Sequence, residues 1–106
     1  MSFTPQLAGS GSYEQVRQLT LTPSAVNSAS WSVETYSGTN CPYITDLQPG
    51  ENLSVTVPFT AAGAAQNNLI LVNAQITTTG TLQLVWYNPT NATITPSLMT
   101  INLIAL

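Results

Sequence analysis

The stretch Leu69–Tyr87, LILVNAQITTTGTLQLVWY, decides the fold. Apolar and polar residues alternate in it with a period of two, which is the pattern of half-buried β-strands rather than of helices. The Thr77–Gly80 segment separates the two alternating runs, and glycine accepts the positive backbone angles that tight turns require. The stretch therefore predicts a β-hairpin with Gly80 near its tip.

The second strand of this hairpin also predicts which side chains are buried. Trp86 shares one face of the strand with Leu82 and Leu84, because side chains two positions apart point to the same side. Val85 and Tyr87 point to the opposite side. We therefore expect Trp86 in the core and Tyr87 at the surface.

The same alternation recurs on both sides of the hairpin. It predicts further strands at Val16–Leu21, Trp31–Tyr36, Leu53–Val57 and Met99–Leu106. Residues that favour turns separate the strands, and they gather in Ser37–Pro42, Gln48–Asn52 and Asn88–Asn91. Short strands divided in this way predict an all-β fold, either an antiparallel β-sandwich or a small jelly-roll or Greek-key barrel.

Two further segments carry specific expectations. The last strand stays apolar to Leu106, so we expect it to be covered, either as a central strand of a sheet or by another subunit. The alanine-rich segment Ala61–Gln66 contains Gly63 and is too short for an isolated helix, so we expect a loop or a single helical turn.

The first fifteen residues differ from the remainder of the chain. They contain the run Gly9–Ser12, and we expect residues 1–15 to form an extended flexible arm ahead of one β-domain at residues 16–106. Phe3, Leu7 and Tyr13 are the large side chains by which this arm could attach to another surface. A frayed terminus is the alternative interpretation.

The charge of the chain excludes several classes of function. Charged residues make up 5% of the 106 residues, the net charge is −3 and there is no histidine. The common serine and cysteine triads need a histidine base, and nucleic acid or anionic membranes need several clustered cations. We expect no enzyme, no cofactor, no metal site, no nucleic acid and no membrane. The charged residues and the lone cysteine are Arg17, Glu14, Glu34, Asp46, Glu51 and Cys41.

Asp46 and Glu51 are the two acids that lie close together in the sequence. A carboxylate pair can hydrolyse glycosides, and two carboxylates with Asn52 offer oxygen ligands to calcium. The intervening Leu47–Gly50 segment is typical of a solvated turn, which is the interpretation we favour.

Aromatic side chains supply a different candidate site. Aromatic faces pack against the apolar faces of sugars, and tyrosine keeps a polar tip. The aromatic residues that could form such a sugar-stacking surface are Trp31, Tyr36, Tyr43, Trp86 and Tyr87, and core packing is the alternative for all of them. Of these, Tyr36, Tyr43 and Tyr87 are the candidate glycan contacts.

The residues from Tyr43 onward carry a resemblance. The runs YITDLQPGENLSVTVP at 43–58 and NLILVNAQITTTGTLQLVWYNPTNATITPSLMTINLIAL at 68–106 resemble a small β-domain of tailed-phage virion proteins, found in head decoration proteins and in fibre modules. The similar positions include Pro49–Gly50, the hairpin from Asn73 to Leu84, and the ending from Ile94. None of them is catalytic, so the resemblance implies a fold and a setting.

This resemblance implies a non-enzymatic virion protein that decorates and stabilises a phage capsid by clamping neighbouring major capsid subunits. The implied partners are the major capsid protein and the chain itself, as a homo-oligomer and most simply a trimer. Phe3, Leu7, Tyr13 and Tyr87 are the expected contacts with the capsid or with a sister subunit. A receptor- or glycan-binding module of a fibre or tail tip is the alternative function.

The composition fits an assembled particle. A weakly charged, Thr- and Asn-rich surface avoids the repulsion that identical charges would cause where many copies meet. No basic segment followed by an apolar run opens the sequence, so we expect synthesis in the host cytoplasm and a final location on the outer capsid surface.

Overall fold

The computed structural model describes residues 16–38, 41–60 and 63–106. The expected arm at residues 1–15 lies outside them. The described residues form six strands and two short 3-10 turns. The strands are β1 (Val16–Leu21), β2 (Ser30–Ser37), β3 (Leu53–Thr56), β4 (Ile70–Thr78), β5 (Thr81–Asn88) and β6 (Met99–Ala105), and the turns are η2 (Pro42–Ile44) and η3 (Ala65–Asn68).

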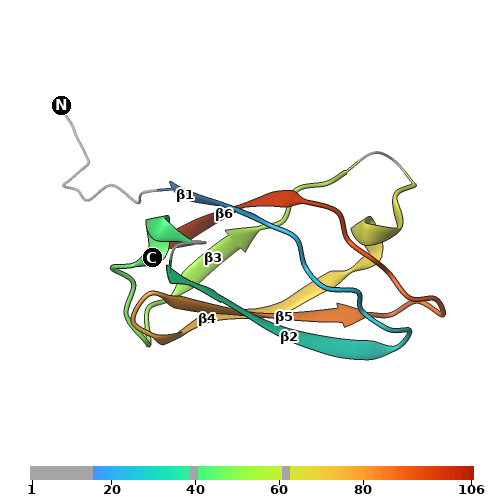
Figure 1. The fold of residues 1–106 in the computed structure, drawn as a ribbon, viewed down its shortest axis with the longest axis horizontal. Helices are drawn as coiled ribbons and strands as arrows, with labels where there is room; N and C mark the ends of the chain where they lie inside the picture. Colours follow the sequence, from blue (N-terminus) through green and yellow to red (C-terminus); the bar gives the residue numbers. More distant parts are fainter. Residues whose placement is uncertain (1–15, 39–40, 61–62) are drawn as a thin grey trace.

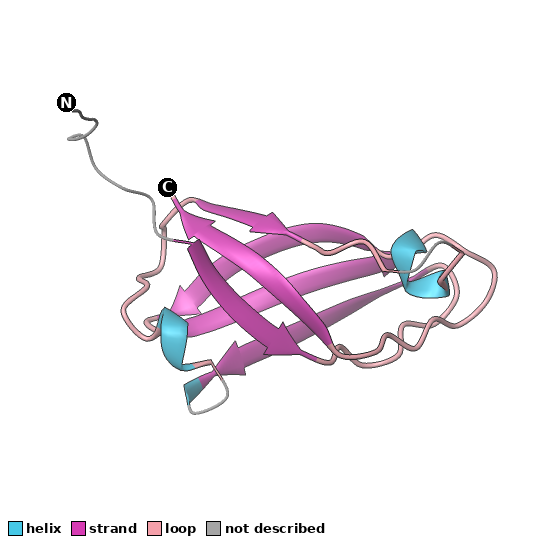
Figure 2. Ribbon diagram, turned by 90° about the horizontal axis from the view of Figure 1, so that it is seen from above, coloured by secondary structure: helices cyan, strands magenta, loops and turns pink. Residues whose placement is uncertain are grey.

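The strands make two three-stranded antiparallel sheets. One has the order β1-β6-β3 and the other the order β2-β5-β4. Figure 1 shows one sheet above the other, and Figure 2 shows the strands of the two sheets from above. The prediction of a small all-β domain is confirmed, and the two separate sheets give it the architecture of a sandwich.

The core lies between the sheets and is almost entirely apolar. Every second residue of β5 and β6 is buried, as expected where one face of a strand packs on another sheet. Trp86 is 1% exposed, so the prediction that it belongs to the core is confirmed. The other large buried side chains are Leu19, Leu21, Val26, Ile44, Leu47, Ile76, Leu82, Leu84, Ile94, Met99, Ile101 and Leu103.

The predicted hairpin is present as β4 and β5. Thr78 pairs with Thr81, so the turn falls at Thr79–Gly80, and Gly80 has φ of +76°. The Gly80 N–H donates to the carbonyl of Leu47 at 2.9 Å. A Cβ atom at Gly80 would stand 3.2 Å from the Cα of Thr45, so the hairpin tip packs directly on the loop that leads into β3.

The C-terminal strand has a central position. β6 pairs with β1 on one side and with β3 on the other. Of the two expected ways to cover this apolar strand, the central position in a sheet is therefore confirmed. In the alanine-rich region, η3 provides one turn at Ala65–Asn68, while residues 61–62 lie outside the described part of the chain.

A buried asparagine joins the loops at the far end of the sandwich. Asn88 is 0% exposed, and its amide donates to the carbonyls of Val26 and Ala92 at 2.9 and 2.8 Å. Its side-chain oxygen accepts from the backbone N–H of Thr90 at 2.9 Å. The sequence placed Asn88 in a turn, but the structure makes it the last residue of β5 and an anchor for the adjoining loops.

Candidate functional site

In strand β2 the large apolar side chains point to solvent and the polar ones point inward, which is the opposite of the usual arrangement. Trp31 and Val33 point outward and are 62% and 60% exposed, whereas Ser32 and Glu34 point toward the other sheet. In a sandwich the apolar residues of a strand normally face the core. The reversal therefore places large apolar side chains where water must cover them unless a partner does.

The neighbouring strands extend this exposed apolar surface. Trp31 lies opposite Tyr87 on β5, and Tyr87 lies opposite Ile70 on β4. Val33 lies opposite Val85 in the same way. Residues directly opposite each other in adjacent strands share a face of the sheet, so these five side chains form one continuous surface, which we call the apolar patch.

The patch is comparable in size to the largest apolar patches of monomeric proteins, which are often functional. Ile70 is 49% exposed, while Tyr87 and Val85 are half-buried. The exposed parts of Trp31, Val33 and Ile70 amount to on the order of 350 Å² on the usual areas of such side chains. Contiguous apolar areas of this size on soluble proteins are commonly binding sites.

The two aromatic residues of the patch contact each other. The ring centroids of Trp31 and Tyr87 are 4.8 Å apart, and the ring planes make an angle of 42°. This spacing lies within the range of favourable aromatic pairs. The contact holds the Trp31 ring against the sheet, although most of its surface faces solvent.

Beyond the patch, the same sheet face becomes polar and uncharged. Thr35 lies opposite Gln83, and Gln83 lies opposite Gln75. The Gln75 amide donates to the side-chain oxygen of Gln83 at 3.0 Å. None of the charged residues in the described part of the chain belongs to this outer face, which therefore combines an apolar end with a neutral polar end.

The inward side of β2 carries a polar contact instead. The Tyr36 hydroxyl donates to one oxygen of Glu34, and the other oxygen accepts from the Ser24 N–H at 2.6 Å. Burial, followed by the adjacent Glu34 carboxylate, raises the pKa of Tyr36 well above its usual range. Tyr36 is half-buried against the core and is not an exposed aromatic side chain.

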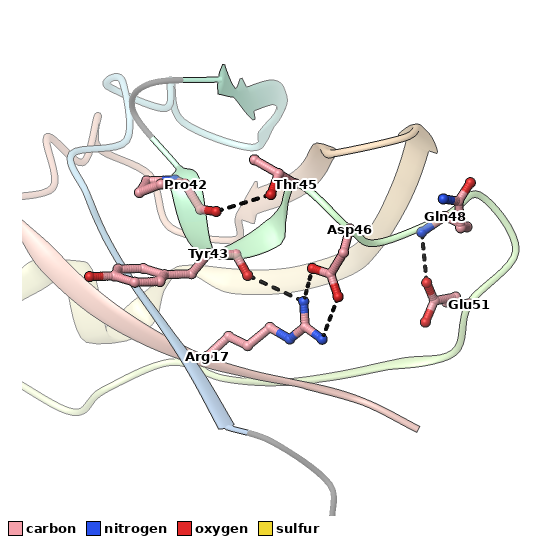
Figure 3. A network of polar contacts seen from close by, with 7 residues as sticks. All are labelled: Arg17, Pro42, Tyr43, Thr45, Asp46, Gln48 and Glu51. Atoms are coloured by element: carbon pink, nitrogen blue, oxygen red, sulfur yellow. Dashed lines mark hydrogen bonds and ion pairs between the residues drawn. The ribbon is translucent and has the colours of Figure 1, made fainter.

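A hollow lies at the start of β1, apart from the apolar patch. There the Arg17 guanidinium donates to both carboxylate oxygens of Asp46, at 2.5 and 3.1 Å, and to the carbonyl of Tyr43 at 3.2 Å (Figure 3). The hydrogen bonds from Arg17 hold the pKa of Asp46 below its ordinary value. The hollow has a volume of about 520 Å³, and Val16 and Gln18 also line it.

The carboxylates of the described residues do not converge on one site. Glu34 bonds Tyr36 and Ser24, Asp46 bonds Arg17, and Glu51 accepts from the Gln48 N–H at 2.6 Å within its own turn. Figure 3 shows Glu51 turned toward Gln48, away from Asp46. Within residues 16–38, 41–60 and 63–106, no three residues of the histidine, cysteine, aspartate and glutamate types are grouped so as to hold a metal ion.

The structure separates the residues that the sequence grouped as candidate contacts. Tyr87 lies in the apolar patch, whereas Tyr43 is 67% exposed beside Arg17, on the other sheet's side of the molecule. The remaining candidates, Phe3, Leu7 and Tyr13, lie outside the described residues. The sequence named Trp31 only among the aromatic residues that could stack on a sugar, and it did not show that Trp31 is the most exposed member of the patch. The available signal was that Trp31 and Val33 fall on the face of Tyr87 once β2 pairs with β5.

Comparison of the chain with protein-family models, with curated proteins and with solved structures finds no match in any of the three. Among the described residues, no helix has the length and apolar character needed to cross a membrane.

Proposed function

We propose that this chain is a non-enzymatic structural protein of a tailed-phage virion, which decorates the outer surface of the capsid and clamps neighbouring major capsid subunits. The observation that carries the proposal is the apolar patch, an uncharged surface on a rigid sheet. The resemblance of residues 43–106 to virion β-domains supplies the setting. Contact through faces of strands is the mode of action.

The energetics of the patch support attachment through several surfaces. Burying on the order of 350 Å² of apolar area contributes about 9 kcal/mol at about 25 cal/mol per Å². Association costs about 4 to 15 kcal/mol in lost translational and rotational freedom. Burial of one patch therefore roughly offsets the free energy lost on association, and stable clamping needs further contact area on each copy. We propose that the arm at residues 1–15 supplies part of it through Phe3, Leu7 and Tyr13.

The polar residues also favour a mechanical role over catalysis. Each described carboxylate already bonds its own partner, and the sequence contains no histidine to move protons near neutral pH. The surface contacts depend little on ion pairs. Attachment to a capsid should therefore be insensitive to salt.

The direct test uses capsids of the parent phage that lack this protein. Purified full-length chain is added at 0.1 M and at 1 M NaCl, and bound copies are measured by co-sedimentation and located by cryo-electron microscopy. We expect saturable binding at symmetry-related positions and the same occupancy at both salt concentrations. Absence of binding to these capsids overturns the proposal, and release by 1 M NaCl contradicts its neutral mode of contact.

The contribution of the arm needs a separate variant. Deleting residues 1–12 should leave the thermal unfolding of the β-domain unchanged and abolish capsid attachment in the same sedimentation assay. Unchanged attachment would remove the arm from the clamping mechanism while leaving the apolar patch as its main element.

A second candidate function rests on the hollow beside Tyr43. Tyr43 is mostly exposed and lines one hollow together with Arg17 and Asp46, so an aromatic face and charged groups border the same space, which is a combination that can bind sugars. A glycan array probed with the wild-type chain and with Tyr43→Ala tests this candidate. Saturable binding that Tyr43→Ala removes would favour a receptor-binding module, and a clamp should bind no sugar.

A further inference from the structure

We infer that the apolar patch binds the same patch on a second copy of this chain, so that the β2-β5-β4 sheets of two copies pack face to face about a two-fold axis. The inference rests on the proposed function in treating the patch as a protein contact. It assigns the patch to the contact between two decorating copies, so that their other surfaces and arms meet the capsid. It replaces the three-fold order that the resemblance implied with a two-fold one.

The chemistry of the patch favours protein over sugar. Val33, Val85 and Ile70 surround the two aromatic rings and offer no hydrogen-bonding groups. Polar residues border the patch on one side only, where Asn73 lies opposite Val85 and the pair Thr35 and Gln83 comes next on the same face. The rings are also tilted by 42° to each other and do not form a flat platform. A sugar stacked there would find partners for few of its hydroxyl groups, whereas apolar side chains would be well matched.

The charge of the face favours a second copy over an unrelated protein. Contacts between different proteins gain selectivity from complementary charges, and identical charges repel when a surface meets itself. The described charged residues, Arg17, Glu34, Asp46 and Glu51, all lie away from this face. Nothing on the face therefore opposes contact with its own copy.

The other outer face argues for two-fold rather than head-to-tail contact. On the β1-β6-β3 sheet most outward residues are polar, and Val16 with Ile104 supply an apolar pair at one end. A head-to-tail ring would set most of the apolar patch against this polar surface. A two-fold contact instead sets apolar surface on apolar surface, which removes more of it from water.

The dimensions of the sheet also fit. Stable interfaces begin at about 600 Å² per partner, and the patch supplies on the order of 350 Å² of apolar surface. The neutral row Thr35, Gln83 and Gln75 lies on the same face and extends the contact as a polar rim. Two sheets pack face to face at a distance of about 10 Å, which aligned strands reach without rearrangement.

The experiment measures self-association of the full-length chain by sedimentation equilibrium between about 1 µM and 500 µM. Val33→Lys places a charge within the contact, and Thr56→Lys places the same charge on an edge strand of the other sheet, where Thr56 is exposed. We expect the wild-type chain and Thr56→Lys to form dimers with similar dissociation constants. For Val33→Lys we expect a dissociation constant of the dimer at least about 30-fold higher.

A second variant keeps the test decisive if Val33→Lys fails to fold. Trp31→Gln removes the largest exposed side chain of the patch without adding charge and should weaken the dimer to a similar extent. Thermal unfolding of each variant reports whether the β-domain is intact. A variant that fails to fold is set aside, and the other decides the outcome.

The outcomes separate this inference from the proposed function. A wild-type chain that is monomeric at 500 µM, or that forms trimers, overturns the inference. Equal dimerisation of the folded variants and the wild type also overturns it. A dimer that depends on Trp31 and Val33 but does not bind capsids supports the inference and overturns the proposed function instead.

Discussion

In the β1-β6-β3 sheet apolar side chains point to the core and mostly polar ones to solvent, whereas at one end of the β2-β5-β4 sheet the outward face is apolar as well. There the outward residues are Trp31, Val33 and Tyr87, and the inward ones include Ser32 and the buried Asn88. The core needs only one apolar face from each sheet. The second apolar face of the β2-β5-β4 sheet therefore points to a contact outside the domain.

The largest expected effect compares the two tryptophans of this sheet. Trp86→Ala should lower the free energy of unfolding by about 3 to 5 kcal/mol, because it empties a buried site. Trp31→Ala should change it by less than about 1 kcal/mol in the monomer, because its ring is mostly exposed. Urea unfolding at low protein concentration measures both, and similar costs would mean that the two faces have been assigned incorrectly.

The next effect tests the polar inner side near the patch. Asn88→Ala should cost about 2 kcal/mol, because the amide holds the Val26 and Ala92 carbonyls and its removal leaves the Thr90 N–H without this acceptor. Asn73→Ala, on the exposed outer side of the same sheet, is the matched control and should change stability by about 0.5 kcal/mol or less. Equal changes in the free energy of unfolding for Asn88→Ala and Asn73→Ala would show that Asn88 does not anchor the adjoining loops.

A smaller effect depends on alkaline pH. The pKa of Tyr36 is raised in the folded chain, so folding favours the neutral phenol. The contribution of the neutral phenol to the free energy of unfolding is complete below about pH 10, the ordinary pKa of tyrosine. It is lost as the pH rises above that value, because the unfolded chain then ionises first. Tyr36→Phe should cost about 1 kcal/mol at pH 7, and its melting temperature should fall less than that of the wild type between pH 10 and 11.5. Parallel curves would contradict the buried hydroxyl contact.

The smallest expected effect concerns the exposed ion pair of the other sheet. The pKa of Asp46 is lowered by Arg17, so the pair stabilises the chain above the ordinary carboxyl pKa of about 3.9 and loses this effect as the pH falls below it. Asp46→Asn should lower the melting temperature slightly at pH 7 and leave the acid part of the curve flatter. Arg17→Gln should reproduce the change at pH 7, and additive effects in the double variant would show that the two side chains do not interact.

The sequence predicted the strands because burial and local pattern agree along most of the chain. Leu82, Leu84 and Trp86 alternate with polar or exposed positions, so both the hairpin and its core face follow from periodicity. The six strand positions are confirmed with ends that shift by one or two residues. β2, β4 and β5 continue past the predicted ends, whereas β3 and β6 stop one residue before them.

The patch and the ion pair could not be predicted in the same way. Alternation in β2 shows two faces but does not say which one meets the core, because that depends on pairing with β5. Arg17 and Asp46 are 29 residues apart and meet only because η2 folds back on β1. The half-burial of Tyr36 follows from the same face assignment. Long-range pairing, rather than local propensity, decides all three.

The contact of Gly80 with the loop before β3 has a mechanical consequence. The tip of the β4-β5 hairpin is fastened to Leu47 and Gln48 at the end of the sheet opposite the patch. A pull applied at the patch is thus carried into the neighbouring sheet instead of peeling the hairpin away. A side chain at position 80 would crowd the Thr45 backbone and loosen that attachment, so the two sheets would be joined less firmly at this end.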